Sequence, residues 1–457
     1  MTTPIADQHF VVLGLARQGL AVTRWLVEQG AQVTVSDAKP EAELPGPIAA
    51  LRDLKVNLAL GGHPLSLLDE CDVLCLSGGV PIDLPIVVEA RQRGIPLTND
   101  AQLFVERCPA PVIGITGSAG KTTTTTLTGE IFKAAHHTTW VGGNIGNPLI
   151  GDLAGILPTD RVVLELSSFQ LDVMTVSPHV AAVLNITPNH LDRHPSMEAY
   201  IEAKRHILDY QSFDDIAVLG YDNPTARALS GRANGYVRFF SREKIMGRGA
   251  FLKGDRILLV QNQEEEVCRL SDIQLRGDHN VLNVLAACAM AAALGVNVAP
   301  MAQAIREFKG VAHRLQLVRE VQGVKYYDGS IASTPERLMA DLNVYTEPIV
   351  LLAGGRDKHL PWEDAAQMIV ERVRELIVFG EMADLVQAAV ETQLNRSAER
   401  LLEKIHHVVT LDEAVAIAAQ VARSGEVVLL SPGGTSYDAF TDFAERGDRF
   451  QELVHGL

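Results

Sequence analysis

The stretch that decides the fold is Ile113-Gly-Ile-Thr-Gly-Ser-Ala-Gly-Lys-Thr-Thr-Thr-Thr-Thr126. Its apolar start predicts a short buried strand, the glycines a tight turn, and the residues after Lys121 a helix. A strand, a glycine turn, a lysine, a hydroxyl and a helix form a cradle for nucleotide phosphates. The backbone N–H groups of the turn attract the phosphates, Lys121 adds a charge for the β- and γ-phosphates, and Thr122 offers a ligand for Mg²⁺.

This loop departs from the strict form of the motif at one position. The strict form has a glycine five residues before Gly120, where this chain has Ile115. The alternative interpretation is a glycine turn that leads into a threonine-rich helix with an exposed lysine. The reaction that uses the bound phosphate therefore has to be inferred from the rest of the chain.

The composition narrows the class of protein. A length of 457 residues predicts two to four domains. The formal net charge of −16 argues against a broad surface for nucleic acid or anionic membranes, although it leaves room for small anionic ligands. The five cysteines have no C-x-x-C spacing, and the N-terminus lacks the features of a signal peptide, so we expect reduced thiols and a cytoplasmic protein. Residues 281–299 carry no charge but are weakly hydrophobic, which favours a buried helix over a membrane span.

The N-terminal segment reads as a βαβ unit. Residues 9–13 predict a strand, residues 14–19 a turn with two glycines, residues 21–29 a helix, and residues 32–36 a second strand that ends at Asp37. An acidic residue about 20 positions after the first glycine is typical of a dinucleotide fold, where it binds a ribose or base. Because only two glycines are present, three interpretations stay open: a nicotinamide cofactor, a nucleotide-sugar diphosphate, and a turn without a ligand.

Polar residues follow several apolar strands at the point where each strand ends. Ser77-Gly-Gly79 follows the strand 72–76, residues 141–148 predict a turn-rich loop with polar side chains, and Glu165 ends the strand 162–164. His190 and its polar neighbours follow the strand 180–186. Because ligands bind at the carboxyl ends of parallel strands, Glu165 is a candidate Mg²⁺ ligand. The alternative is a glutamate that caps the strand at the surface.

Lys204 lies on an apolar helix face together with Ile201, Ile207 and Leu208. A lysine in such a position usually extends its ammonium group towards solvent. The second interpretation is a desolvated lysine near the metal site, whose lowered pKa allows CO₂ to carbamylate it. The asparagines Asn280 and Asn283, at i and i+3 on the next buried helix, leave a similar choice between binding adenine and capping the helix.

Four more strands near residues 326, 349, 376 and 427 each lead into glycines and polar residues, which predicts a second Rossmann-like layer with its own ligand edge. We expect the helices of this layer to end with basic residues near Arg446 to Arg449. We therefore predict an α/β protein of three domains. They are an N-terminal Rossmann-like domain (1–106), a central P-loop ATPase-like domain (107–310) and a C-terminal Rossmann-like domain (311–457).

The ordered set of motifs resembles the Mur ligase family over essentially the whole chain. The motifs are Thr116-Gly-Ser-Ala-Gly-Lys-Thr122, Gly142-Gly-Asn-Ile-Gly146, Glu165-Leu-Ser-Ser-Phe-Gln-Leu171, Asn189-His-Leu-Asp-Arg193, His279-Asn280, His313-Arg314, Ser330-Ile-Ala-Ser333 and Ser431-Pro-Gly-Gly-Thr-Ser436. The Ser-Ser-Phe-Gln run favours the members that add D-glutamate. The resemblance implies an ATP-dependent ligase of cytoplasmic peptidoglycan synthesis that acts as a monomer. This ligase joins D-glutamate to UDP-N-acetylmuramoyl-L-alanine through an acyl phosphate and has no nucleic-acid or membrane partner.

The resemblance also implies a role for each matching position. The catalytic residues are Lys121, Asn144, Glu165, His190 and Lys204. ATP is bound by Thr116, Gly117, Ser118, Ala119, Gly120, Lys121, Thr122, Thr123, Asn280, Asn283, Arg314 and Asp328. Two Mg²⁺ ions are bound by Thr122, Glu165, His190 and the carbamate of Lys204. The UDP-linked substrate is bound by Gly14, Leu15, Ala16, Arg17, Asp37, Ser77, Gly78, Gly79 and Asn144. D-glutamate is bound by Ser333, Lys358, Ser436 and Phe443.

One departure from the family pattern keeps other interpretations in view. Family members often carry a ribose-binding aspartate where this chain has Gly329, so Asp328 is the residue expected to substitute for it. The alternatives are a sibling ligase that adds another amino acid (including L-glutamate), a folylpolyglutamate synthase-like ligase, a nicotinamide-dependent dehydrogenase, and a nucleotide-binding regulator without chemistry.

Overall fold

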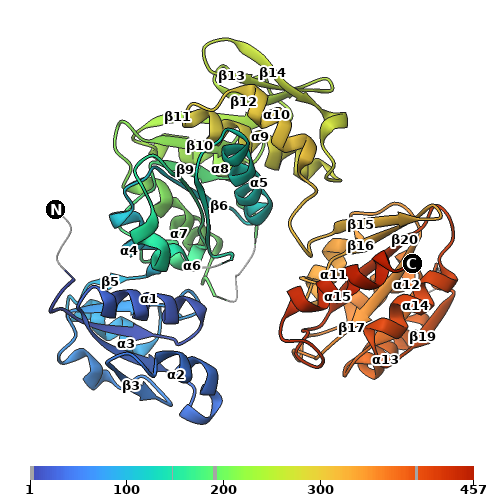
Figure 1. The fold of residues 1–457 in the computed structure, drawn as a ribbon, viewed down its shortest axis with the longest axis horizontal. Helices are drawn as coiled ribbons and strands as arrows, with labels where there is room; N and C mark the ends of the chain where they lie inside the picture. The colour runs from blue at the N-terminus through green and yellow to red at the C-terminus, as the bar shows by residue number, and fades with distance from the viewer. Residues whose placement is uncertain (1–4, 147, 189–192, 397–399) are drawn as a thin grey trace. The chain divides into compact units, whose positions relative to one another are not determined.

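The computed structural model describes residues 5–146, 148–188, 193–396 and 400–457, which form two compact units (Figure 1). The larger unit comprises Met1–Gln274 and Asp278–Phe308, and the C-terminal unit comprises Leu275–Gly277 and Lys309–Leu457. The larger unit contains two sheets and the C-terminal unit one. The predicted α/β class is confirmed, whereas the domain limits at residues 106 and 310 stay predictions.

The first sheet has five parallel strands in the order β3-β2-β1-β4-β5. Its elements are β1 (His9–Leu13), α1 (Arg17–Glu28), β2 (Gln32–Asp37), α2 (Pro45–Leu51), β3 (Val56–Leu60), β4 (Val73–Leu76), α3 (Pro85–Gln92), β5 (Leu97–Thr98) and α4 (Asp100–Arg107). The turn after β1 and the loop after β4 therefore meet at one edge of the sheet, as the βαβ interpretation predicts.

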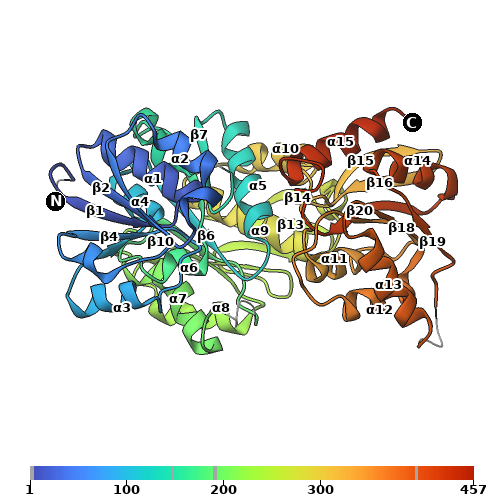
Figure 2. The same cartoon turned by 90° about the horizontal axis from the view of Figure 1, so that it is seen from below.

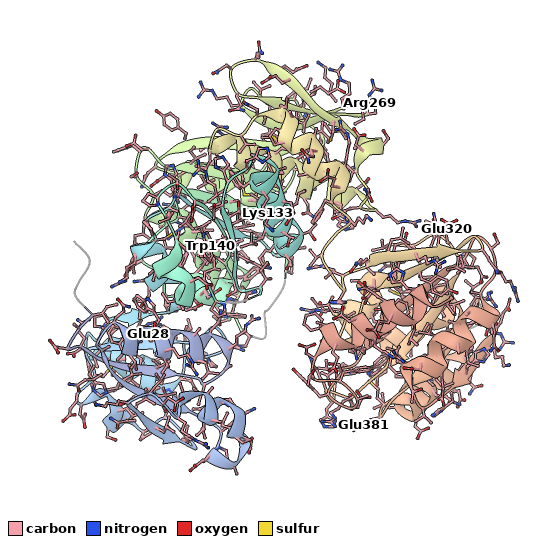
Figure 3. The ribbon with its side chains drawn as sticks, in the orientation of Figure 1. Glu28, Lys133, Trp140, Arg269, Glu320 and Glu381 are labelled. Carbon is pink, nitrogen blue, oxygen red and sulfur yellow. The ribbon has the colours of Figure 1, made fainter. Side chains whose placement is uncertain are left out.

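The second sheet has nine strands in the order β14-β13-β12-β11-β10-β9-β6-β8-β7. Its strands are β6 (Val112–Thr116), β7 (Thr139–Gly143), β8 (Arg161–Glu165), β9 (Val180–Val183), β10 (Ile216–Gly220), β11 (Tyr236–Ser241), β12 (Gly249–Lys253), β13 (Arg256–Val260) and β14 (Glu264–Arg269). Its helices are α5 (Lys121–Ala134), α6 (Ser168–Leu171), α7 (Met197–Asp209), α8 (Pro224–Ala228), α9 (Asp278–Ala293) and α10 (Val298–Glu307). Only the pairs β12–β13 and β13–β14 are antiparallel, and β14, which ends at Arg269 (Figure 3), forms one outer edge.

The third sheet, in the C-terminal unit, has the order β15-β16-β20-β17-β18-β19, and only its β15–β16 pair is antiparallel. Its elements are β15 (Gln316–Val321), β16 (Val324–Asp328), α11 (Pro335–Leu342), β17 (Ile349–Gly354), α12 (Glu363–Arg372), β18 (Val373–Phe379), α13 (Ala383–Leu394), β19 (Lys404–His407), α14 (Leu411–Val421), β20 (Val427–Gly433) and α15 (Phe443–His455). Figure 2 shows α12 and α13 on one face of this sheet and α14 and α15 on the other. Two separate apolar clusters pack those two faces.

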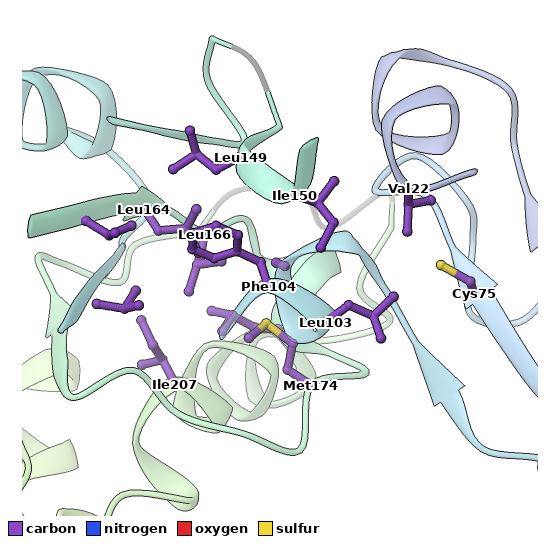
Figure 4. Close-up of a cluster of buried hydrophobic side chains, with 14 of the residues drawn as sticks. Val22, Cys75, Leu103, Phe104, Leu149, Ile150, Leu164, Leu166, Met174 and Ile207 are labelled. Carbon is purple, nitrogen blue, oxygen red and sulfur yellow. The ribbon is translucent and has the colours of Figure 1, made fainter. Parts of the chain in front are cut away.

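The larger unit has a continuous apolar core that runs through both of its sheets. Figure 4 shows part of it, where Leu103 and Phe104 of α4 lie among Leu149, Ile150 and Leu164. All five side chains are at most 5% exposed. Since burial of each such side chain contributes about 1.5–3 kcal/mol, this packing holds the first sheet's loops against the second sheet.

Two expectations about local structure can be compared with the fold. The segment 141–148, interpreted as a turn-rich loop, begins within strand β7, so that expectation is wrong for residues 141–143. The uncharged segment 281–299 is confirmed as a buried helix over most of its length, α9. Within the described ranges, no helix is long and apolar enough to cross a membrane.

Candidate active site

The phosphate loop lies between the buried strand β6 and the start of α5, as its sequence predicts. Gly120 adopts a left-handed φ of +83°, and a Cβ atom there would lie 2.3 Å from Oδ1 of Asn283. Both observations explain why this position requires glycine. The loop is further held by Asn185, whose Oδ1 accepts a 2.9 Å hydrogen bond from the backbone N–H of Ala119.

Lys121 folds its side chain over the same loop. Its Nζ donates to the carbonyl oxygens of Gly117 at 2.8 Å and Ser118 at 3.4 Å. These carbonyls hold the ammonium group against the glycine loop. Thr122, in the first turn of α5, is partly exposed at the same place, next to the buried Thr123 and Thr124 of the same helix.

Glu165 ends strand β8 and is only 2% exposed. Its Oε1 accepts a 2.9 Å hydrogen bond from Nδ2 of Asn144, which follows the neighbouring strand β7. Its buried Oε2 has no hydrogen-bond partner within the described part of the chain. A buried carboxylate oxygen without a partner is costly unless a cation or a proton donor joins it, so this site fits a metal ion. The alternative of a surface cap is wrong.

Lys204, on α7, is 1% exposed and extends inward, so the solvent-directed alternative is also wrong. Its Nζ donates to the Gly117 carbonyl at 3.1 Å and lies 3.3 Å from the Thr116 hydroxyl, both in the phosphate loop. Burial, reinforced by the charge of Lys121, holds the pKa of the Lys204 ammonium well below its usual value, although Glu165 opposes this shift. A lysine with a lowered pKa has a larger neutral, nucleophilic fraction.

The predicted metal ligand His190 lies outside the described residues. The neighbouring Arg193 is described: its Nη2 donates to the Gly79 carbonyl at 2.9 Å, and its guanidinium lies 4.9 Å from the centre of the Phe169 ring. Arg193 thus links the loop after β4 to the Glu165 motif. Within the described ranges, no group of three or more His, Cys, Asp or Glu side chains could hold a metal ion.

The two predicted adenine residues contact each other. Nδ2 of Asn283 donates to Oδ1 of Asn280 at 3.0 Å, and Oδ1 of Asn283 accepts from the Thr124 hydroxyl at 3.2 Å. The start of α9 is thereby tied to α5, one turn after the phosphate loop. This arrangement brings the pair close to the cradle, and their contact with adenine stays a prediction.

Asp37 holds the N-terminal loop that is predicted to bind UDP. The carboxylate of Asp37 accepts hydrogen bonds from the backbone N–H groups of Leu15 at 2.7 Å and Lys39 at 2.9 Å. The Ser77 hydroxyl donates to the Gly14 carbonyl at 2.9 Å, which joins the loops after β1 and β4. Gly78 lies beside this contact, while Ala16, Arg17 and Gly79 are exposed at the same edge. Arg17 reaches the second sheet, where its Nη2 donates to the Asn144 carbonyl at 3.4 Å.

The C-terminal unit brings together two of the residues predicted for D-glutamate. Nζ of Lys358, in the loop after β17, donates to the Ser333 hydroxyl at 3.4 Å. Ser436 is buried in the loop after β20, and Phe443 is 39% exposed at the start of α15. Arg314, the residue predicted for phosphates and ribose, is exposed before β15.

Asp328 and Arg446 differ from their sequence interpretation. Asp328 is completely buried, and its oxygens already accept hydrogen bonds from the Ser330 N–H at 2.9 Å and the Gln451 amide at 2.8 Å, beside the His313 ring. It therefore presents no open acceptor to a ribose in this conformation. Arg446, interpreted as part of a basic helix end, is completely buried and donates to the Ser330 hydroxyl and carbonyl and to the Gly434 carbonyl. Nothing in its sequence context distinguished it from an exposed arginine.

Comparison with protein families accounts for most of the chain. Residues 8–99 match the N-terminal domain described as Mur ligase MurD-like, residues 115–291 the Mur ligase middle domain, and residues 313–434 the Mur ligase glutamate ligase domain. Two similar proteins are named UDP-N-acetylmuramoylalanine--D-glutamate ligase. The protein from Acetivibrio thermocellus is 40% identical over 99% of this chain and 97% of its own, and that from Pelotomaculum thermopropionicum is 42% identical over 100% and 99%.

Solved structures share the fold at lower sequence identity. UDP-N-acetylmuramate-alanine ligase MurC from Thermotoga maritima superposes with a TM-score of 0.57 at 21% identity and covers 98% of this chain and 99% of its own. MurF from Acinetobacter baumannii superposes with a TM-score of 0.58 at 17% identity, over 100% and 93% of the two chains. Both are three-domain α/β proteins, which agrees with the three sheets found here.

Proposed function

The chain belongs to the Mur ligase family, and we infer that it is the ATP-dependent ligase that adds D-glutamate to UDP-N-acetylmuramoyl-L-alanine in peptidoglycan synthesis. One observation carries this conclusion: identity of about 40% with D-glutamate ligases extends through all three sheets. The small-molecule substrates follow from it, and ATP is the energy source of the family. A nicotinamide-dependent dehydrogenase or a regulator without chemistry has no comparable support.

The reaction needs ATP because hydroxide is a poor leaving group from a free carboxylate. In the first step, a carboxylate oxygen of the UDP-linked substrate attacks the γ-phosphorus of ATP, the bond to the β-phosphate oxygen breaks, and an acyl phosphate and ADP form. In the second step, the amine of D-glutamate attacks the acyl carbon, loses a proton, and expels inorganic phosphate. The product is an amide, and one ATP becomes ADP and phosphate.

The phosphate loop has the main task in the first step, in which two anions must approach each other. The backbone N–H groups from Gly117 to Gly120 and the start of α5 bind the phosphates, and Lys121 opposes the charge that develops on the transferred group. Its hydrogen bonds to two loop carbonyls support this role, since they hold the ammonium group close to where the phosphates bind. Asn144, positioned by Glu165, orients the acceptor carboxylate.

Magnesium would be held by Thr122, Glu165, His190 and a carbamylated Lys204, and it would neutralise charge on the phosphates. The buried, unpartnered Oε2 of Glu165 supports one ion. The burial of Lys204 supports the modification, in which the neutral amine attacks CO₂, a C–N bond forms, and a proton leaves. The resulting carbamate is an anion, which removes the repulsion between a lysine ammonium and a metal ion.

The remaining assignments follow from the loops at the sheet edges. We propose that the loops at Gly14–Arg17, Asp37 and Ser77–Gly79 bind the UDP group, and that Ser333, Lys358, Ser436 and Phe443 bind D-glutamate. We also propose a cytoplasmic monomer, in keeping with five cysteines that carry no disulfide within the described chain, four of them buried.

The decisive experiment measures phosphate release from ATP with UDP-N-acetylmuramoyl-L-alanine and D-glutamate present, and with each omitted in turn. Release should require all three substrates, and mass spectrometry should identify the D-glutamyl product. Other amino acids, beginning with L-glutamate, serve as the comparison for a sibling ligase. Release that proceeds equally well with a different amino acid would refute the assignment of D-glutamate.

A further inference from the structure

A short segment, Leu275–Gly277, belongs to the C-terminal unit, although the chain on both sides of it belongs to the larger unit. We call this segment the strap. Its flanking residues are fixed in the larger unit. The side-chain amide of Gln274 donates to the Arg306 carbonyl, and Oδ2 of Asp278 lies 2.8 Å from Nη2 of Arg242. The larger unit therefore holds the strap at both ends.

Arg276, in the middle of the strap, contacts the C-terminal unit through both its charge and its plane. Its Nη1 donates to Oε1 of Glu347, in the loop before β17, at 2.6 Å. Its guanidinium carbon lies 5.3 Å from the ring centre of Tyr327 and 5.8 Å from that of Tyr345. Both tyrosines are at most 5% exposed. A planar guanidinium can form an ion pair and lie over aromatic rings at the same time, which favours arginine over lysine at this position.

The ion pair between Arg276 and Glu347 is partly shielded from water. The two side chains are 32% and 28% exposed, and burial by itself acts to raise the pKa of Glu347. The hydrogen bond and the charge of Arg276, together with two backbone N–H groups, outweigh burial and hold that pKa below its usual value. The carboxylate is therefore charged at neutral pH, and the ion pair persists there.

The strap leads directly into the helix that carries the proposed adenine residues. Only Gly277 separates Arg276 from α9, and its φ of +89° is left-handed. Asn280, in the first turn of α9, accepts a hydrogen bond from Nδ2 of Asn283, whose Oδ1 accepts from the Thr124 hydroxyl of α5. Since the strap is continuous with this turn, a displacement of Arg276 acts on the start of α9.

The chain enters the C-terminal unit a second time, at Lys309. A Cβ atom at Gly310 would lie 3.2 Å from Cδ2 of Leu275, so this second connection packs on the strap. The C-terminal unit is thus joined to the rest of the chain through two adjacent segments, and the strap is the one that continues into α9.

We propose that Arg276 couples the nucleotide site to the C-terminal unit, so that ATP and D-glutamate each strengthen the binding of the other. The inference rests on the proposed function, which assigns adenine to α9 and D-glutamate to the C-terminal unit. Arg276 is a positioning residue that touches neither ligand: a nucleotide that fixes the start of α9 also fixes the strap, and the strap restricts the C-terminal unit. Coupling of this kind is reciprocal and typically changes each affinity about 5- to 150-fold.

The test measures the Kd of the full-length protein for β,γ-imido-ATP, with the UDP-linked substrate present and D-glutamate present or absent. In the wild type, D-glutamate should lower this Kd at least about fivefold. In Arg276→Gln, D-glutamate should change it less than about twofold, whereas the Kd without D-glutamate should stay within about twofold of the wild type. The matched control is Arg306→Gln, because Arg306 forms its ion pair within the larger unit, with Asp272 at 3.6 Å, and this variant should keep the full coupling.

Two further variants separate the contact from a general loss of structure. Glu347→Gln should lose the coupling as Arg276→Gln does, and the double variant should lose no more, because both changes remove the same contact. Arg276→Lys keeps the charge and should keep part of the coupling. Wild-type coupling in Arg276→Gln, an equal weakening of nucleotide binding with and without D-glutamate, or no coupling in the wild type would overturn the inference. Failure of the proposed function is distinct, because wild-type phosphate release would then not depend on D-glutamate.

Discussion

The substitution Gly120→Ala tests the phosphate loop at its most constrained point. The backbone φ of +83° at this position is left-handed, and the new methyl group would lie 2.3 Å from Oδ1 of Asn283. That oxygen accepts a hydrogen bond from Thr124, and the amide of Asn283 donates to Asn280. The substitution therefore strains the loop and displaces the asparagine pair at the same time.

The cost has two parts. A left-handed backbone costs alanine about 1–2 kcal/mol relative to glycine. Moving Asn283 away loses its two hydrogen bonds, each of which contributes about 0.5–1.5 kcal/mol. The total destabilisation of the loop is about 2–5 kcal/mol. The loop can relieve this strain only by moving the backbone N–H groups that bind phosphate. If about 2 kcal/mol of this destabilisation adds to the activation free energy of the reaction, kcat/KM for ATP falls about 30-fold.

The assay is ATP-dependent phosphate release at saturating concentrations of the other substrates, with a thermal unfolding curve for each variant. Gly254→Ala is the matched control, because Gly254 has a φ of +66° but no atom within 4 Å of its Cβ position. It carries the backbone cost alone, in the turn between β12 and β13, and should keep wild-type kinetics. The argument is refuted if Gly120→Ala keeps kcat/KM for ATP within about threefold of the wild type.

Three further predictions concern titratable side chains. Lys121→Ala should lower phosphate release by at least about 100-fold, because the variant loses the charge that opposes the developing phosphate anion; turnover near the wild-type rate would exclude this role. If Lys204 is carbamylated, wild-type protein depleted of CO₂ should lose activity, and bicarbonate should restore it. The Lys204→Gln variant should be inactive with or without bicarbonate. Native mass spectrometry should detect the added mass of one CO₂ only in the wild type. Burial raises the pKa of Asp341 to about 7, so its protonation stabilises the folded state fully below about pH 4, and this contribution is lost as the pH rises through about 7. Thermal unfolding midpoints should therefore favour Asp341→Asn over the wild type increasingly between pH 4 and 8, and a constant difference would contradict the buried carboxyl.

Sequence patterns predicted the parts of the site that belong to a single strand–loop–helix unit. The phosphate loop is one such unit, and Glu165 ends a strand whose apolar residues are visible in the sequence. Burial of Lys204 could only be offered as one of two alternatives, because an apolar helix face does not say whether the end of a long side chain turns inward. The structure settles it through contacts with the phosphate loop, almost ninety residues earlier in the chain.

Other features depend on contacts between distant segments, and no local pattern indicates them. Strand β7 was interpreted as a loop because its glycine pair and following asparagine resemble a turn, yet pairing with β8 makes it a strand. Strands β3 and β19 have weak, partly exposed patterns and were not predicted.

The outer strand β14 has a consequence for the behaviour of the protein at high concentration. It exposes unpaired backbone groups at the end of a nine-stranded sheet, where another copy could add a strand. Three consecutive glutamates, Glu264 to Glu266, form half of this strand, and two of them are exposed. Glu264 and Glu266 form ion pairs with Lys253 and Arg256 of the neighbouring strands. Docking of a second copy here would remove water from these charged side chains, so they protect the edge of the sheet against aggregation. Replacing the exposed glutamates with valine would turn this protected edge into a template for self-association.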